Sequence, residues 1–248
     1  MKGLTSKELR AWTPPYQPYI IGSGILVPGT KMIIYGKFQS WKSMLAMHTS
    51  YCIANGKDWF GFPTTKTPTF TLQIEVPQAE MKVRVEQYLN HNPEMECDQN
   101  WFCTEPYIKL DKGYGHGELE REIGRTGAKV VFIDPAYKVI SGHITDLYDL
   151  SQFTDRIDLL IAKYNISVII VHHPRKAQTF EGKEIDMGGD DMFGTYLQNW
   201  CDTCIRTTTT DIDGELILTF IKARHAHDLL KPFAVKVDRK TLMFRRLQ

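Results

Sequence analysis

The stretch YGKFQSWKSMLA, residues 35–46, comes close to the phosphate-binding loop pattern G-x-x-x-x-G-K-[ST]. Gly36, Lys42 and Ser43 fit this pattern, and Trp41 stands where the second glycine is usual. In such a loop, backbone N–H groups surround the phosphates, the lysine reaches the β- and γ-phosphate oxygens, and the hydroxyl binds Mg²⁺. The pattern therefore predicts a site for a nucleoside triphosphate, with ATP and Mg²⁺ as the expected ligands.

Trp41 is the objection to this interpretation, because glycine normally lets the backbone approach the phosphates closely. A larger residue is compatible with binding when its Cβ points away from the anion and its indole lies beside the nucleotide or on a subunit surface. Two alternatives stay open: the spacing is a coincidence, or Trp41 has closed the site. The surroundings favour binding, because the loop follows the apolar run Met32–Tyr35 and precedes an amphipathic helix expected over Ser43–Asn55.

Polar residues stand directly after three further apolar runs, which have the continuous pattern of strands buried on both faces of a parallel sheet. Because the carboxyl ends of parallel strands meet along one edge, where ligands bind, we expect these residues to converge beside the loop. One such residue alone is better explained as a solvated strand end, but three in this order favour a shared site. They are Glu75 after Thr69–Ile74, Asp134 after Lys129–Ile133, and His172 with His173 after Val168–Val171.

Apolar runs alternate with helical stretches through the middle of the chain, which is typical of an α/β fold with a mostly parallel central sheet flanked by helices. The C-terminal part differs, because its apolar runs read as antiparallel strands joined by turns at 211–214 and 238–240. Helices are expected over Ser43–Asn55, about Ala79–His91, about Leu119–Thr126 and Leu150–Tyr164, and late strands over Thr203–Thr209, Glu215–Ile221, Phe233–Val237 and Thr241–Arg245.

The chain begins with the polar segment Met1–Tyr19, which contains three prolines and reads as an irregular arm that packs on the domain or on a neighbour. The predicted division is an N-terminal arm at 1–24 and one ATPase domain at 25–248. The net charge of +1 over 248 residues gives no overall basic field that would indicate nucleic acid. The absence of a signal peptide and of a long apolar run favours the cytoplasm, or the host cytoplasm for a viral protein.

The cysteines allow two interpretations. Cys201 and Cys204 have the C-x-x-C spacing of zinc or redox sites, but the chain has five cysteines and no second pair at zinc-ribbon spacing. Small buried residues are the favoured interpretation, with reduced thiols.

With these motifs in place, the chain resembles the RecA-like P-loop ATPases, specifically the RepA-type hexameric replicative helicases and related phage and plasmid ATPases. It is more distantly similar to DnaB-type helicases. The resemblance covers Ile25–Phe244, and the segment Ser40-Trp41-Lys42-Ser43 is similar to a loop variant of that family, S-[FW]-K-S. The resemblance implies nucleotide contacts from Gly36, Gln39, Ser40, Trp41, Lys42, Ser43 and Met44.

The same resemblance implies roles for the polar strand ends. Lys42 would neutralise the β- and γ-phosphates, Ser43 would ligate Mg²⁺, and Asp134 would hold Mg²⁺ through water. Glu75 resembles the catalytic glutamate that activates the attacking water. His172 and His173 resemble the pair that senses the γ-phosphate.

The segment Phe220–Phe244 resembles the K-x-R strand end of the family, which implies that Lys222 and Arg224 reach into the site of an adjacent subunit. Arg224 is the candidate arginine finger, a group that stabilises charge on the transferring phosphoryl. Arg206 is the second candidate for this role.

The resemblance also implies single-stranded DNA as a partner, bound in the channel of a homo-oligomeric, hexameric ring by two loops, Tyr137–Leu147 and Pro174–Phe193. Phosphate contacts of this kind are independent of sequence and sensitive to salt. The leading hypothesis is therefore a ring-forming DNA helicase or translocase in replication or recombination. An ATP-gated mediator, loader or regulator with little unwinding activity stays open, because the second loop is acidic. The basic and aromatic residues in the two loops are Lys138, His143, Arg175, Lys176, Phe180 and Lys183.

Overall fold

The computed structural model describes residues 3–13, 15–142, 146–172, 179–180, 183–184 and 195–247. Within these residues, a nine-stranded sheet forms the centre of the molecule. Its strands are β1 (Lys31–Gly36), β2 (Thr69–Gln73), β3 (Asn100–Thr104), β4 (Val130–Asp134), β5 (Ser167–His172), β8 (Thr203–Thr209), β9 (Glu215–Ala223), β10 (Phe233–Val237) and β11 (Phe244–Arg246).

The strand order is β11-β10-β9-β8-β1-β5-β4-β2-β3. Strands β8 to β3 in this order run parallel to one another, so their carboxyl ends share one edge of the sheet. The register sets Tyr35 beside His172 and Gln73 beside Asp134 at that edge. Strands β1, β2, β4 and β5 are buried on both faces almost throughout, which explains their continuous apolar sequences. The α/β class predicted from the sequence is confirmed.

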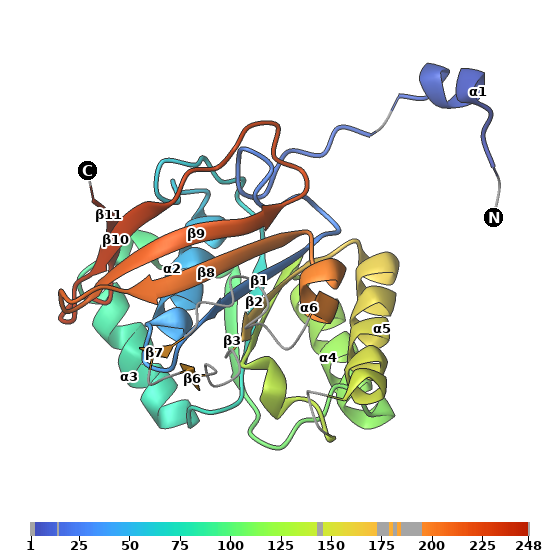
Figure 1. The fold of residues 1–248 in the computed structure, drawn as a ribbon. Helices are drawn as coiled ribbons and strands as arrows, with labels where there is room; N and C mark the ends of the chain where they lie inside the picture. The colour runs from blue at the N-terminus through green and yellow to red at the C-terminus, as the bar shows by residue number, and fades with distance from the viewer. Residues whose placement is uncertain are drawn as a thin grey trace.

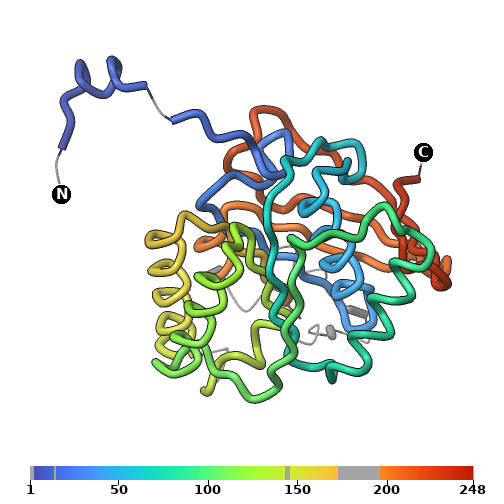
Figure 2. Tube along the Cα trace, turned by 180° about the vertical axis from the view of Figure 1, so that it is seen from behind, coloured from blue at the N-terminus to red at the C-terminus, as the bar shows by residue number. Residues whose placement is uncertain are grey.

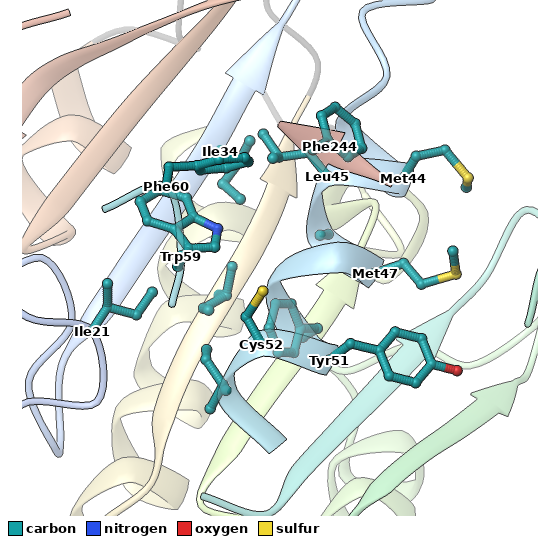
Figure 3. Close-up of a cluster of buried hydrophobic side chains, with 14 of the residues drawn as sticks. Ile21, Ile34, Met44, Leu45, Met47, Tyr51, Cys52, Trp59, Phe60 and Phe244 are labelled. Carbon is teal, nitrogen blue, oxygen red and sulfur yellow. The ribbon is translucent and has the colours of Figure 1, made fainter. Parts of the chain in front are cut away.

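Helices cover both faces of the sheet and complete three layers (Figures 1 and 2). Adjacent residues of β1 serve opposite faces, because side chains alternate along a strand: Ile34 belongs to one apolar core and Ile33 to the other. Figure 3 shows the first core, in which Leu45 and Met47 lie near Trp59 and Phe244. The helices are α2 (Lys42–Asn55) and α3 (Gln78–Leu89) on the first core, and α4 (Gly113–Thr126), α5 (Leu147–Tyr164) and α6 (Thr195–Trp200) on the second.

Helix α2 differs from the expected amphipathic pattern, because nearly all of its residues are buried. The sheet covers one side of the helix, and the segment around Trp59 and the last strands cover others. Strands β9, β10 and β11 extend the sheet antiparallel beyond β8, as predicted, and Figure 1 shows them curving over α2. The turns of this extension lie beside the loop between β1 and α2, as the cavity described below shows.

The N-terminal arm contains a short helix, α1 (Ser6–Ala11), where the sequence analysis expected irregular chain. A capping box explains it, because the Thr5 hydroxyl accepts from the backbone N–H of Glu8 while the Glu8 carboxylate accepts from the Thr5 N–H. The helix lies away from the body in Figures 1 and 2, and all of its residues are exposed. Ile20 and Ile21 are already buried in the first core.

Two further elements were missed or misplaced by the sequence analysis. Strand β3 is the edge strand of the parallel set, and its residues are only half-buried, so it lacks a long apolar run. Helix α4 begins at Gly113, six residues before the predicted start, because its three early glycines conceal the helical pattern. Gly115 is required there, since a Cβ would lie 2.2 Å from the carbonyl oxygen of Lys109. The remaining short elements are 3₁₀ turns η1 (Pro93–Met95) and η2 (Ala136–Lys138), and a hairpin of β6 (Thr179–Phe180) and β7 (Lys183–Glu184).

Cys201 and Cys204 are buried in the second core with free thiols. In the described part of the chain, no three histidine, cysteine or carboxylate side chains lie close enough to hold a metal ion among themselves. No helix in the described ranges is long and apolar enough to cross a membrane.

Candidate active site

The loop between β1 and α2 is shaped by the neighbouring strand β8. A Cβ on Gly36 would lie 2.1 Å from the Thr207 hydroxyl oxygen and 2.4 Å from the Thr207 carbonyl oxygen, so only glycine fits there. The hydroxyl of Ser40, which is buried, lies 3.0 Å from the same Thr207 hydroxyl. The first glycine of the sequence pattern is therefore a consequence of close contact with β8.

Trp41 takes the backbone conformation that a glycine would take in this loop. Its φ and ψ are 57° and 16°, in the left-handed region, and Gln39 has a φ of 62°. These angles are unusual for residues with a side chain and are held here by the surrounding structure. The indole lies under the guanidinium of Arg239, whose Cζ is 5.0 Å from the ring centroid. The indole forms part of the wall of the site and leaves the cavity open.

Lys42 is the first residue of α2, and only 3% of it is exposed. Its ammonium group donates to the carbonyl oxygen of Lys37 over 2.6 Å and to the hydroxyl of Ser40 over 3.1 Å. Burial lowers the pKa of Lys42 to about 8, while the negative charges of Asp134 and Glu75 oppose this shift. The ammonium group is thus held by the loop itself, in a position from which a phosphate could take over its hydrogen bonds.

Asp134 ends β4 and lies directly behind the loop. Burial raises its pKa to about 6, and a hydrogen bond with Ser43 has the opposite, smaller effect. The side-chain amide of Gln73 also donates to the Asp134 carboxylate over 3.0 Å. A serine hydroxyl paired with a carboxylate supplies the oxygen donors that Mg²⁺ prefers, so the residues present fit this ion.

Glu75 follows β2 and is tied to the same group of residues. Its backbone N–H donates to the side-chain oxygen of Gln73 over 2.8 Å. Its carboxylate accepts a hydrogen bond from the phenol of Tyr137, which lies in η2 just after Asp134. Gln73 therefore connects the two acidic residues, one through its amide nitrogen and the other through its oxygen.

A cavity of about 750 Å³ opens over these residues, within the size range of small-molecule sites. The predicted contacts Gln39, Ser40, Trp41, Lys42, Ser43, Met44 and Glu75 line it. Lining residues that the sequence analysis missed come from β2, from α3 and from the turns of the C-terminal strands; they include Gln73, Arg84, Gln87, Ile212, Asp213, Arg239 and Leu242.

Some of the missed residues left a signal in the sequence and others did not. Gln73 is a polar residue inside the apolar run before Glu75, which marks it as unusual for a buried strand. Arg84 lies on α3, and its charge lowers the pKa of Asp134. Arg239 is 198 residues from Trp41, so only the folded structure reveals that the two are in contact.

The histidine pair is described only in part. His172 is fully buried at the end of β5, next to Tyr35 of β1, and His173 lies outside the described residues. Arg206 lies on β8 and is also level with Tyr35, one residue before the Thr207 that contacts the loop.

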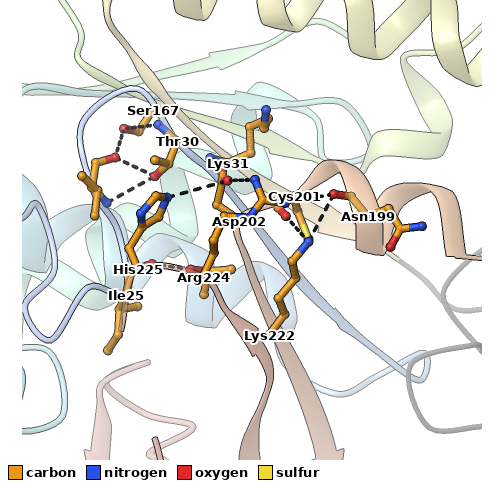
Figure 4. A network of polar contacts seen from close by, with 12 residues as sticks. Ile25, Thr30, Lys31, Ser167, Asn199, Cys201, Asp202, Lys222, Arg224 and His225 are labelled. Atoms are coloured by element: carbon orange, nitrogen blue, oxygen red, sulfur yellow. Dashed lines mark hydrogen bonds and ion pairs between the residues drawn. The ribbon is translucent and has the colours of Figure 1, made fainter. Parts of the chain in front are cut away.

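Lys222 and Arg224 lie at the opposite edge of the sheet from the loop of their own chain. Lys222 is level with Cys204 near the start of β8, whereas Gly36 is level with Thr207 near its end. The Lys222 ammonium group donates to three carbonyl oxygens at the end of α6, those of Gln198, Asn199 and Cys201 (Figure 4). Arg224 Nη1 donates to Asp202 Oδ1 over 2.7 Å. Their predicted action on a neighbouring subunit stays a prediction.

The two predicted DNA loops are described unevenly. In the first, Lys138 lies with its Nζ 5.5 Å from the ring centroid of Tyr137, the residue that contacts Glu75. His143 in this loop, and Arg175 and Lys176 in the second, lie outside the described residues. Of Phe180 and Lys183, the structure gives only the backbone of β6 and β7.

Solved structures share this fold across most of the chain. The ATPase domain of a helicase superimposes with a TM-score of 0.69 and 10% identity, covering 93% of each chain. The RadB recombinase gives a TM-score of 0.59 and 18% identity over 89% of this chain and 92% of that one. The KaiC-like protein PH0186 from the archaeon Pyrococcus horikoshii OT3 gives 0.63 and 11% over 95% and 100%. At these identities the likeness establishes the fold alone.

The amino-acid sequence also has a family match, which is independent of the superpositions. No curated protein matches the chain in sequence. The family model of the AAA domain matches residues 2–179, which include the phosphate-binding loop, Glu75 and Asp134. The chain therefore belongs to the AAA domain family and is a RecA-like P-loop ATPase related to replicative helicases.

Proposed function

We propose that this protein is an ATP-hydrolysing motor that acts on single-stranded DNA in replication or recombination, as a ring-forming helicase or translocase. The observation that carries the proposal is the convergence of Lys42, Ser43 and Glu75 on one cavity, with Asp134 bonded to Ser43 beneath it. Each residue comes from a different strand end or from the start of α2, and each has a distinct role in phosphoryl transfer.

Binding begins at the loop. The γ- and β-phosphate oxygens would replace Lys37 and Ser40 as acceptors for the Lys42 ammonium group, and the start of α2 would direct its N–H groups at the anion. Ser43 and Asp134 would hold Mg²⁺, which when bound neutralises charge on the phosphate oxygens. Arg84 adds a further positive charge to the same wall of the cavity.

Hydrolysis needs a base beside the γ-phosphate, and Glu75 is the candidate. Its carboxylate would accept a proton from water as the water oxygen forms its bond to the γ-phosphorus. The bond between the γ-phosphorus and the bridging oxygen then breaks, and ADP leaves with that oxygen. Gln73 supports this role, because it binds both the Glu75 backbone and the Asp134 carboxylate.

Assembly would complete the site. Arg224 is separated from the loop of its own chain by the length of the sheet, and its side chain is half-exposed, so a neighbouring copy is the place where it could meet a phosphate. An arginine supplied in this way contributes by stabilising charge in the transition state. Closed rings of identical subunits bring such heterologous surfaces together at every interface.

The link to DNA rests on Tyr137 and Lys138. Tyr137 bonds to the candidate base Glu75, and the first predicted DNA loop begins at the same residue. A phosphate that draws Lys138 away from the Tyr137 ring would therefore disturb the hydrogen bond on Glu75. DNA binding and hydrolysis would be coupled through one side chain.

The test for a shared site mixes two inactive variants. Lys42→Ala lacks a working loop and Arg224→Ala lacks the finger, so each alone should hydrolyse ATP poorly. A random 1:1 mixture should regain about a quarter of wild-type turnover, since about one interface in four combines an intact loop with an intact finger. A mixture no more active than the separate variants, while both still assemble, would contradict action between subunits.

The DNA part is tested separately, by steady-state ATPase rates with and without single-stranded DNA, followed by unwinding of a forked duplex. Stimulation that falls as salt rises supports phosphate contacts. A second candidate function is an ATP-gated mediator, loader or regulator. The internal contacts of Lys42 and Glu75 favour it, because they would keep turnover low until a partner binds. Tight ATP binding with no stimulation by DNA would support this alternative.

A further inference from the structure

We propose that Trp41 and Arg239 form the nucleobase subsite of this protein, and that they bind the base by stacking rather than by reading its hydrogen-bonding edge. The inference rests on the proposed function, because it assigns the end of the cavity opposite the phosphate-binding residues. It also gives a role to Trp41, the residue that departs from the usual loop pattern.

The position follows from the extent of the cavity. Lys42 and Ser43 fix the triphosphate at one end. The other wall comes from two turns of the C-terminal strands, one around Asp213 between β8 and β9 and one around Arg239 between β10 and β11. A nucleotide anchored by its phosphates at Lys42 must therefore direct its sugar and base along the wall that contains Trp41 and Arg239.

The chemistry of this wall suits a flat aromatic ring. The guanidinium of Arg239 and the indole of Trp41 are both planar, and the Arg239 Cζ lies 5.0 Å from the indole centroid. Arginine and tryptophan faces bind nucleobases by stacking and by cation–π attraction. Ile212 and Leu242, which line the same wall, add apolar surface.

Asp213 fixes the orientation of the guanidinium. Its carboxylate accepts from Arg239 Nε over 2.6 Å and from Arg239 Nη2, so two parallel bonds hold the flat group. Both side chains are largely exposed, so this pair contributes little to stability in water. Its consequence is geometric, since it keeps one face of Arg239 on the indole.

The backbone around Arg239 is held from two further directions. The side-chain amide of Gln87, on α3, donates to the carbonyl oxygens of Arg239 over 2.6 Å and Lys240 over 3.1 Å. The carbonyl oxygen of Gly214 accepts from the Val237 N–H over 2.8 Å. Gly214 has a φ of +74°, and a Cβ there would lie 2.8 Å from the Val237 carbonyl oxygen, so this contact requires glycine.

Stacking has a consequence for specificity. Every nucleobase has an aromatic face, so a site of this kind accepts all four nucleoside triphosphates, and binds purines more tightly because their rings are larger. The sequence analysis gave no nucleotide preference. We expect ATP and GTP to bind with similar affinity, and CTP and UTP more weakly.

The experiment compares ATP with inorganic tripolyphosphate, which has the same charged chain and no base. Binding is measured by calorimetry on the full chain, for the wild type, Arg239→Ala, Arg239→Lys and Trp41→Gly. Arg239→Lys keeps the charge and loses the flat face. Arg245→Ala is the control, because Arg245 lies on the exposed part of β11 outside the cavity.

We expect Arg239→Ala, Arg239→Lys and Trp41→Gly each to raise the Kd for ATP about tenfold. Arg239→Lys and Trp41→Gly should leave the Kd for tripolyphosphate within about twofold, and Arg245→Ala should change neither ligand. ATP, but not tripolyphosphate, should quench the part of the tryptophan fluorescence that Trp41→Gly removes.

The subsite is overturned when ATP binds the wild type and these variants equally, or when the variants weaken ATP and tripolyphosphate to the same degree. In that case the phosphate site and the proposed function stand. Failure of the wild type to bind either ligand would overturn both. Melting curves without ligand identify a variant that has lost its fold, and Arg239→Lys, which preserves the charge beside Asp213, then carries the comparison.

Discussion

The side-chain amide of Gln73 donates a hydrogen bond to the carboxylate of Asp134 over 3.0 Å, between neighbouring strands at the carboxyl edge of the sheet. Both side chains are almost fully buried. The bond satisfies a carboxylate whose burial raises its pKa to about 6, and the other end of the amide holds the backbone of Glu75. Gln73 is thus a positioning residue for the acidic pair.

Replacing Gln73 by methionine keeps the size of the side chain and removes both bonds. We expect kcat/KM for ATP to fall about 10- to 100-fold, which corresponds to the loss of a buried hydrogen bond to a charged group. Steady-state kinetics at several Mg²⁺ concentrations check this, and Gln78→Met at the exposed start of α3 is the control. Unchanged kinetics in a folded Gln73→Met protein would show that the acidic pair needs no such support.

Removing the Tyr137 hydroxyl should affect regulation. Tyr137→Phe frees the Glu75 carboxylate from its hydrogen bond, so we expect severalfold faster hydrolysis without DNA and a smaller stimulation by DNA. Tyr148→Phe, an exposed tyrosine on α5, is the matched control. An unchanged ratio of the rates with and without DNA would exclude coupling through this contact.

Lys42 is expected to lower the stability of the nucleotide-free protein. Burial lowers its pKa from 10.5 to about 8, so folding below pH 8 must bury a charged ammonium group. This cost fades as pH rises from 8 to 10.5, where the group becomes neutral in the unfolded chain as well. Lys42→Met should raise Tm at pH 7 by about 5 °C while abolishing hydrolysis.

The comparison that isolates this effect is Lys37→Met, which changes an exposed lysine of the same loop. Calorimetric melting at pH 7 and pH 10 should show the gain from Lys42→Met shrinking at the higher pH. A Lys42→Met protein less stable than the wild type at pH 7 would mean that the internal hydrogen bonds of the ammonium group outweigh its burial.

His48 predicts the behaviour of the first core in acid. The ring is buried on α2, with Nδ1 3.0 Å from the Tyr88 hydroxyl on α3 and Nε2 3.6 Å from the Cys52 sulfur on its own helix. The rings of Phe60 and Phe244 cover it. Burial lowers the pKa of His48 from 6.5 to about 4.

Since the unfolded chain binds this proton at a higher pH than the folded one, the free energy of unfolding falls as pH drops from 6.5 to 4, by about 3 kcal/mol in total. Urea unfolding at several pH values measures this loss. His48→Gln, which cannot take up the proton, should lose less between these pH values, and His91→Gln, at an exposed imidazole, should follow the wild type. Parallel acid profiles for His48→Gln and the wild type would refute the assignment.

The order of elements in the parallel half of the sheet followed from the sequence because its strands are buried on both faces. Their apolar runs are continuous, and each ends in a polar residue that the structure places at the same edge. The edge strand β3 and the start of α4 gave no such signal: β3 is half-buried, and the glycines of α4 are there for close contact with Lys109.

The phosphate end of the site was predictable for the same reason, since Lys42, Ser43, Glu75 and Asp134 belong to local motifs. The opposite wall was not predictable. Trp41 and Arg239 meet only because β9, β10 and β11 extend the sheet past β8, and no local pattern encodes a contact between residues so far apart in the chain. The predicted objection to Trp41 is answered by its left-handed backbone, which orients the indole along the wall.

The central claim is that Lys42, Glu75 and Asp134 serve one triphosphate site, and parallel measurement of MgATP binding and turnover tests it most directly. The wild type should bind and hydrolyse, Lys42→Ala should do neither, and Glu75→Gln should bind with near wild-type affinity while losing turnover. Undiminished hydrolysis by Glu75→Gln, or undiminished ATP binding by a folded Lys42→Ala protein, would contradict the claim.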